Sequence, residues 1–140
     1  MHIRDVMTIG VRMIPPDASI FQIARHMRDE DIGAMPVVEN DKLVGIVTDR
    51  DIVLRALAAY PEERRTTARD VMSTRLLYCF DDQSVEDVLD NMGDRQVRRM
   101  PVVDRDKRLV GVVSLGDLAV SSTPDRTGYS LSMISQHTQQ

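Results

Sequence analysis

The chain has 140 residues with one cysteine, a net charge of −4 and a pI near 5.3. That length fits one compact domain, and the acidic balance argues against a broad surface for nucleic acid or membrane. One cysteine excludes an internal disulfide, no apolar run reaches about 18 residues and the first residues do not resemble a signal peptide, so we expect a soluble cytoplasmic protein.

The first predicted helix begins at Ser19. Gln22 follows at the spacing of a capping box, and apolar residues then recur at helical intervals. The run at 35–38, Met-Pro-Val-Val, is apolar and β-branched, which predicts a buried strand paired in a hairpin with 43–47. A helix over 49–59 completes the first set of elements, which has the order strand, helix, strand, strand, helix.

The stretch that starts at Arg4 is written a second time from Arg69, at an offset of 65 residues. One inserted residue before Leu109 increases the offset, so that Leu43 corresponds to Leu109. Ser84 opens the second copy's first helix, strands follow at 100–103 and 109–113, and a helix at 115–121 ends the copy. A repeat of this size is a whole supersecondary unit. We therefore predict an α/β (α+β) fold of two βαββα repeats packed with pseudo-twofold symmetry.

The repeats set the predicted domain boundaries. Repeat 1 covers 1–59, a polar linker with four consecutive charges covers 60–68, and repeat 2 covers 69–121. Residues 122–140 are rich in Ser, Thr and Gln, with a weak apolar patch at Leu131, Met133 and Ile134. We expect this tail to be flexible or docked on a partner, where the patch adds to a dimer contact.

In both repeats the second hairpin strand ends at a hydroxyl residue, and an aspartate follows three positions later. The pairs are Thr48 with Asp51 and Ser114 with Asp117. At a helix start, backbone N–H groups and a hydroxyl suit a phosphate, while the aspartate can accept from both hydroxyls of a ribose. Plain helix capping explains the same spacing, so both interpretations stay open.

These residues resemble those of CBS domains, βαββα modules that occur in tandem pairs known as Bateman modules. The shared features are Val-Met-Thr and Val-Met-Ser near each start, Pro16-Asp17 with Ser19, and the paired Met-Pro-Val-Val, Leu-Val-Gly and Thr/Ser-x-x-Asp sequences. The resemblance covers nearly all of 4–121. It implies an adenosyl ligand such as AMP, ADP, ATP or S-adenosylmethionine in the cleft between the repeats, and a flat homodimer formed through helices.

Carried onto this sequence, the resemblance implies ribose-binding acids at Asp51 and Asp117 and phosphate-binding hydroxyls at Thr48 and Ser114. In such pairs the adenine usually packs on the opposite repeat. The Asp51 site would then use Leu77, Val97 and Arg98, and the Asp117 site would use Arg12, Ile32 and Gly33 with Ala34 beside them. Main-chain groups there would read the adenine edge, with apolar walls from Leu77, Val97 and Ile32.

The basic residues differ between the repeats. Arg98 and Arg99 correspond to Gly33 and Ala34, and Arg50 corresponds to Gly116. With crossed pairing, the three arginines converge on the Asp51 site, where guanidinium groups suit phosphate. We predict that this site binds a phosphorylated ligand better than the Asp117 site. The alternative is that these arginines are only solvated surface charges.

No other residues predict a catalytic or metal site. His2, His26 and His137 match no metal spacing, and the sequence has no P-loop, H-E-x-x-H or nucleophile elbow. Cys79, between Tyr78 and Phe80, is expected in the core.

We therefore expect a regulatory module that is not an enzyme, has no cofactor and senses an adenine nucleotide on behalf of a protein target, with no nucleic-acid or membrane partner. The alternatives are a structural or dimerisation module that binds no nucleotide, or a module for another adenosyl ligand such as NAD or S-adenosylmethionine. An enzyme is the third possibility.

Overall fold

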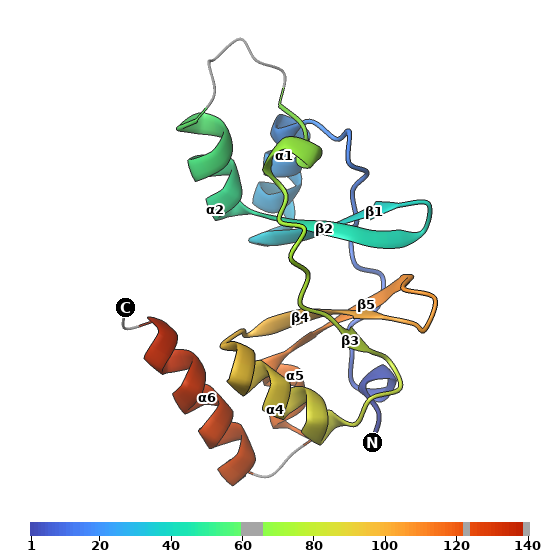
Figure 1. Ribbon diagram of the computed structural model, residues 1–140, viewed down its shortest axis with the longest axis vertical. Helices are drawn as coiled ribbons and strands as arrows, with labels where there is room; N and C mark the ends of the chain where they lie inside the picture. The colour runs from blue at the N-terminus through green and yellow to red at the C-terminus, as the bar shows by residue number, and fades with distance from the viewer. Residues whose placement is uncertain (60–65, 122–123, 139–140) are drawn as a thin grey trace. The chain divides into compact units, whose positions relative to one another are not determined.

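The computed structural model describes residues 1–59, 66–121 and 124–138, and the chain divides into two compact units. One unit is Arg12–Leu76, and the other combines Met1–Val11 with Leu77–Gln140. Each unit contains an antiparallel hairpin with helices packed on it, which confirms the predicted mixture of helices and strands (Figure 1). The first residues of each repeat therefore belong to the unit built around the other repeat.

The unit Arg12–Leu76 contains the elements of repeat 1. They are α1 (Ile20–Glu30), β1 (Ala34–Glu39), β2 (Lys42–Thr48), α2 (Asp49–Asp51) and the π-helix η2 (Ile52–Leu57). The short helix α3 (Ala68–Val71), at the start of repeat 2, also belongs to this unit. The predicted first strand is reduced to one bridge, between Ile14 and Val37 of β1. Ser19 caps α1 as predicted, but its hydroxyl accepts from Phe21 N–H at 3.1 Å rather than from the amide of Gln22.

The helix predicted over 49–59 begins at Asp49 but changes geometry after three residues. Ala58 N–H donates to Val53 O, five residues back, at 3.1 Å, which is the π-helical pattern. Ile52 and Ala56 of η2 are buried, whereas Val53 and Leu57 are exposed. The helix therefore has one face in the core and a second apolar face on the surface.

The predicted linker at 60–68 is only partly within the described residues. Its last residues, Thr66 to Ala68, are packed and not a polar connection: Thr66 and Ala68 are buried. Ile20 N–H donates to Thr66 O at 3.2 Å, and Ala68 N–H donates to Ala18 O at 2.9 Å. These residues are held because their backbone groups complete the start of α1.

The other unit contains the elements of repeat 2 and both ends of the chain. They are η1 (Ile3–Asp5), β3 (Cys79–Phe80), α4 (Val85–Arg95), β4 (Arg99–Val103), β5 (Leu109–Ser114), α5 (Leu115–Ala119) and α6 (Pro124–Thr138). The sheet has the order β3-β4-β5, with β3 parallel to β4. Both hairpins have an irregularity at the same place, between Val37 and Val38 in β1 and between Val102 and Val103 in β4.

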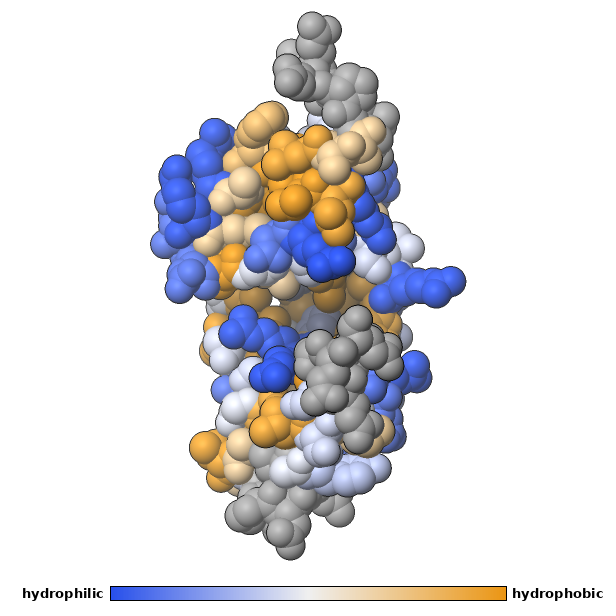
Figure 2. Space-filling view, turned by 90° about the vertical axis from the view of Figure 1, so that its left-hand side faces the viewer, coloured by the Kyte–Doolittle hydropathy of each residue, from blue (hydrophilic) through white to orange (hydrophobic). Residues whose placement is uncertain are grey.

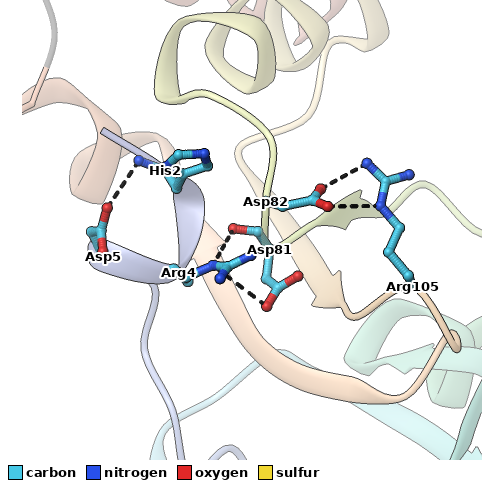
Figure 3. A network of polar contacts seen from close by, with 6 residues as sticks. All are labelled: His2, Arg4, Asp5, Asp81, Asp82 and Arg105. Atoms are coloured by element: carbon cyan, nitrogen blue, oxygen red, sulfur yellow. Dashed lines mark hydrogen bonds and ion pairs between the residues drawn. The ribbon is translucent and has the colours of Figure 1, made fainter.

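The N-terminal segment is fixed to this unit by backbone and side-chain bonds. Ile3 is fully buried and its N–H donates to Gln83 O at 2.9 Å. Arg4 Nε lies 3.7 Å from a carboxylate oxygen of Asp81, and the bidentate pair of Arg105 with Asp82 lies beside it (Figure 3). The Arg105 guanidinium lowers the pKa of the Asp82 carboxyl. This pair is exposed, so we assign it a role in local geometry rather than in stability.

The same close approach occurs in both units, between a glycine of the hairpin and a methionine of the other repeat's first segment. A Cβ atom at Gly111 would lie 2.8 Å from Met7 Sδ and from Thr8 O, and one at Gly45 would lie 2.5 Å from Met72 Sδ. Thr8 pairs with Val112 and Ser73 with Ile46 at these points. The duplicated Leu-Val-Gly and Val-Met sequences are thus packing partners across the repeats.

The tail predicted to be flexible or docked on a partner is a helix over most of its length. The helix α6 packs on α4 of the same unit, where Ser130 and Ile134 are buried. Ser130 Oγ donates to Leu89 O at 2.9 Å. The sequence did not predict this helix because its contact with α4 combines the small residues Gly93 and Ser130 with the buried Ile134 and shows no long apolar stripe.

Each unit has its own apolar core. The core of Arg12–Leu76 includes Ile14, Ile20, Ile23, Met35, Val37, Val47, Ile52 and Val71, and that of the other unit includes Ile3, Val85, Val88, Leu89, Met92, Met100, Val102, Val113 and Leu118. Cys79 is 1% exposed in the second core, as predicted. Among the described residues, no helix has the length and apolar character needed to cross a membrane.

Candidate functional site

The turn after β2 is a reciprocal capping box. Thr48 N–H donates to Asp51 Oδ2 at 2.9 Å, and Asp51 N–H donates to Thr48 Oγ1 at 3.1 Å. The Asp51 side chain is 17% exposed, and its second oxygen lies 3.7 Å from Arg55 Nε. Capping holds the carboxylate in one position while part of its acceptor capacity stays open, since a carboxylate has about four acceptor sites.

The turn after β5 has the same geometry. Ser114 N–H donates to Asp117 Oδ2 at 2.9 Å, and Asp117 N–H donates to Ser114 Oγ at 3.1 Å. The helix-capping interpretation of both aspartates is therefore confirmed. Capping and ligand binding use different lone pairs of the same carboxylate, so the finding does not exclude a ribose.

Gly33 and Ala34, at the start of β1, lie against the turn of their own repeat. Gly33 O accepts from Asp49 N–H at 2.9 Å, and Ala34 pairs with Thr48. A Cβ atom at Gly33 would lie 3.2 Å from Asp49 Oδ2, so a larger residue there would require a small shift of the Asp49 side chain.

In repeat 2 the same bonds involve arginines. Arg98 O accepts from Leu115 N–H at 2.8 Å, and Arg99 pairs with Ser114. The structure thus fixes the backbone of Arg98 and Arg99 beside the Ser114 turn. The side chains of both residues are exposed.

The predicted crossed sites each combine residues of two units. Asp51 belongs to Arg12–Leu76, whereas its predicted adenine-side residues Leu77 and Val97 belong to the other unit. Conversely, Asp117 belongs to the second unit and Arg12 and Ile32 to the first. The geometry within each unit leaves both crossed sites as predictions.

The arginines divide into paired and unpaired groups. Arg12, expected at the Asp117 site, forms an ion pair with Glu30. Arg50, Arg98 and Arg99, expected at the Asp51 site, have no carboxylate within ion-pair distance among residues 1–59, 66–121 and 128–135. An unpaired guanidinium has no internal ion pair to lose when an anion binds.

The structure adds one contact and one hollow that the sequence analysis did not predict. Arg55 lies four residues after Asp51 on the same helix face and approaches its carboxylate, a spacing that sequence alone could have indicated. A hollow of about 400 Å³ is lined by Asp49, Arg50, Val53 and Leu54. It lies on the face of α2 and η2 where hydrophobic side chains gather next to charged ones (Figure 2).

The described part of the chain contains no cluster of side chains that could form a metal site, and its cysteine is buried. No three His, Cys, Asp or Glu side chains there gather as a metal site would need. Burial raises the pKa of the Cys79 thiol to about 12, so the thiol is neutral and unreactive at ordinary pH.

Comparison with known proteins agrees with these features. The model of the CBS domain family matches residues 3–57 and 68–121. The CBS domain-containing protein YhcV of Bacillus subtilis is 40% identical over 134 residues, which cover 95% of this chain and 94% of that protein.

Two solved structures are also similar. Hypoxic Response Protein I, crystallised with two coordinated zinc ions, has 36% identity and a TM-score of 0.77, with 87% of this chain and 99% of that chain covered. The CBS-domain pair of protein MJ0100, in complex with 5′-methylthioadenosine and S-adenosyl-L-methionine, has 27% identity and a TM-score of 0.71, with 86% and 98% covered. The family model matches each of the two sequence repeats once, so this chain belongs to the CBS-domain family and carries a tandem CBS pair.

Proposed function

We propose that the chain is a regulatory module that binds an adenine nucleotide with residues of both CBS repeats and passes the signal to a protein target. The observation that carries this proposal is the pair of capping boxes. Each holds its aspartate, Asp51 or Asp117, in the same position relative to its own turn and leaves acceptor sites on the carboxylate open. A ribose needs such a fixed acceptor for its two hydroxyls. The adenosyl ligands of the MJ0100 pair support the class of ligand.

The two sites are proposed to be unequal. The Asp51 site would draw on Arg50, Arg98 and Arg99, which are unpaired among the described residues, so that a 5′-phosphate gains charge-assisted bonds there. At the Asp117 site, Arg12 is engaged by Glu30 and Gly116 replaces Arg50. We therefore assign AMP, ADP or ATP to the Asp51 site, and a ligand with less charge at the ribose to the Asp117 site.

Regulation would follow from differential affinity. A ligand shifts a conformational equilibrium only by the difference in its affinity for the two states. The module is proposed to act without catalysis, as a homodimer whose contact includes the exposed apolar residues of η2, Val53, Leu54 and Leu57.

A structural module is the second candidate, and the apolar face of η2 is the observation that favours it (Figure 2). In that case dimerisation alone would be the function, and both aspartates would only cap helices. The two candidates differ in whether ligand adds stability.

Thermal shift and calorimetry with AMP, ADP, ATP, NAD and S-adenosylmethionine test the proposal. A ligand at 100 times its Kd should stabilise the chain by about 2.7 kcal/mol. The Asp51→Asn variant keeps an oxygen that can accept from Thr48 N–H but loses the charge, so it should bind AMP at least about tenfold more weakly. The matched Asp117→Asn variant should keep most of the AMP affinity. Absence of a shift with all five ligands would support the structural module instead.

A further inference from the structure

The C-terminal helix α6 is anchored at the end of α4, next to the segment that carries Arg98 and Arg99. Gln96 Nε2 donates to Met133 O at 3.2 Å, and Ser130 Oγ donates to Leu89 O at 2.9 Å. Ile134 is 2% exposed. Gln96 also ends α4 with φ of 58°, in the left-handed region where residues other than glycine are uncommon. One residue therefore ends α4 and ties it to α6.

A short bonded path leads from this anchor to the candidate site. Val97 N–H donates to Met92 O at 3.1 Å, and the next residue, Arg98, accepts from Leu115 N–H at 2.8 Å. Leu115 directly follows Ser114 of the capping box. The segment of Val97, Arg98 and Arg99 is thus held at one end by the helix that α6 covers and at the other end by the turn.

The first repeat has the same helix end but a different residue there. Asp31 ends α1 with φ of 53° and corresponds to Gln96. Arg28 corresponds to Gly93, is largely exposed and pairs with Asp29 at 2.8 Å. In the described part of the chain, the helix end bonded to α6 is the one that the two adjacent arginines follow.

We propose that docking of α6 on α4 positions the Val97, Arg98 and Arg99 segment for phosphate, so that nucleotide binding and α6 docking stabilise each other. This inference rests on the proposed function, which assigns these arginines to the ligand. When α6 undocks, the segment has more conformations, and a ligand must pay the entropy of ordering it. By reciprocity, a ligand that orders the segment favours the docked helix. Gln96 is then a positioning residue, and α6 is the element whose state reports ligand.

The Gln96→Gly variant removes the hydrogen bond from Gln96 to Met133 without disturbing the end of α4. Glycine favours the left-handed conformation, so α4 should end at the same place while the bond to Met133 is lost. Hydrogen exchange of the full-length protein without ligand should become about three to ten times faster in peptides that cover 97–99 and 128–135. The matched Asp31→Gly variant changes the equivalent residue of α1 and should leave both peptides unaffected. Equal exchange at 97–99 in the two variants would overturn the positioning role.

Calorimetry with AMP then tests the coupling to ligand. Gln96→Gly should weaken AMP binding by about three to ten times without lowering Tm, whereas Asp31→Gly should not change the affinity. In the unsubstituted chain, AMP should slow exchange in α6. Unchanged AMP affinity in Gln96→Gly, with normal binding by the unsubstituted chain, contradicts the coupling. Failure of the unsubstituted chain to bind AMP contradicts the proposed function, whereas the exchange result without ligand still decides whether α6 orders residues 97–99.

Discussion

Gly93 of α4 and Ser130 of α6 approach so closely that a Cβ atom added at Gly93 would lie 3.1 Å from both Ser130 Cα and Ser130 Oγ. The obstacle is the backbone of α6, which cannot rotate away as a long side chain can. The repeat-equivalent residue of Gly93 is Arg28, whose side chain would block a helix at the same place on α1. The absence of a side chain at Gly93 therefore allows the close contact between α4 and α6.

The Gly93→Leu variant should therefore displace α6. Overpacking of this kind costs about 1–3 kcal/mol, of which leucine recovers part through its better helix propensity. We expect a lower Tm and faster hydrogen exchange in α6. Arg28→Leu is the matched control on the exposed face of α1 and should change Tm little. Equal Tm values for the two variants would mean that α6 tolerates a larger residue at Gly93.

The two capping boxes have nearly identical distances, so they should contribute equally to stability. Thr48→Ala and Ser114→Ala each remove the hydroxyl that accepts the aspartate N–H at 3.1 Å. We expect a loss of about 1 kcal/mol for each, measured by urea denaturation without ligand. A clearly larger loss in one variant would show that its hydroxyl has a further structural partner.

Substitution of the hairpin glycines should have unequal effects although the glycines are repeat-equivalent. A Cβ atom at Gly111 would lie 2.8 Å from the backbone oxygen of Thr8, whereas the three atoms nearest to one at Gly45 all belong to the side chain of Met72. A methionine side chain can change rotamer, but a strand backbone cannot move without breaking its pairing. Gly111→Ala should cost about 1–3 kcal/mol, and Gly45→Ala less than Gly111→Ala, in chemical denaturation. The reverse order would contradict this explanation.

Burial of Cys79 predicts a loss of stability at alkaline pH. Its thiol pKa is raised from the ordinary value of 9.0 to about 12 in the folded protein. Above pH 9.0 the unfolded chain releases the thiol proton while the folded chain keeps it, so stability falls between pH 9.0 and about 12 and is unaffected below that window. Cys79→Val should remove this component of the pH dependence.

The burial of the Cys79 thiol can also be tested by the rate at which a thiol reagent modifies it. A buried neutral thiol reacts slowly with a disulfide reagent, so native protein at pH 8 should be modified only as fast as it opens. Fast modification of native protein would show that Cys79 is more accessible than its 1% exposure indicates.

Much of the fold could be predicted because the duplication repeats local signals. Ser19 and Ser84 cap their helices, the Met-Pro-Val-Val runs form buried strands, and both hydroxyl–aspartate pairs form the expected turns. These elements depend on neighbours within a few residues, and periodicity and capping spacing describe such neighbours directly.

The amino-acid sequence by itself determined the repeat, the order of its elements and the residues that belong to each turn. Only the tertiary structure decided that the first segment of each repeat packs with the other repeat, that α6 covers α4 and that Gln96 ties α6 to the arginine segment. These contacts join residues far apart in the chain, as in the hydrogen bond between Ser130 and Leu89. They depend on whether individual side chains and backbones fit together, which a periodic sequence pattern does not describe. Gly93 and Arg28 show the reason: equivalent positions on equivalent helices differ in whether a backbone can approach, and only packing reveals that difference.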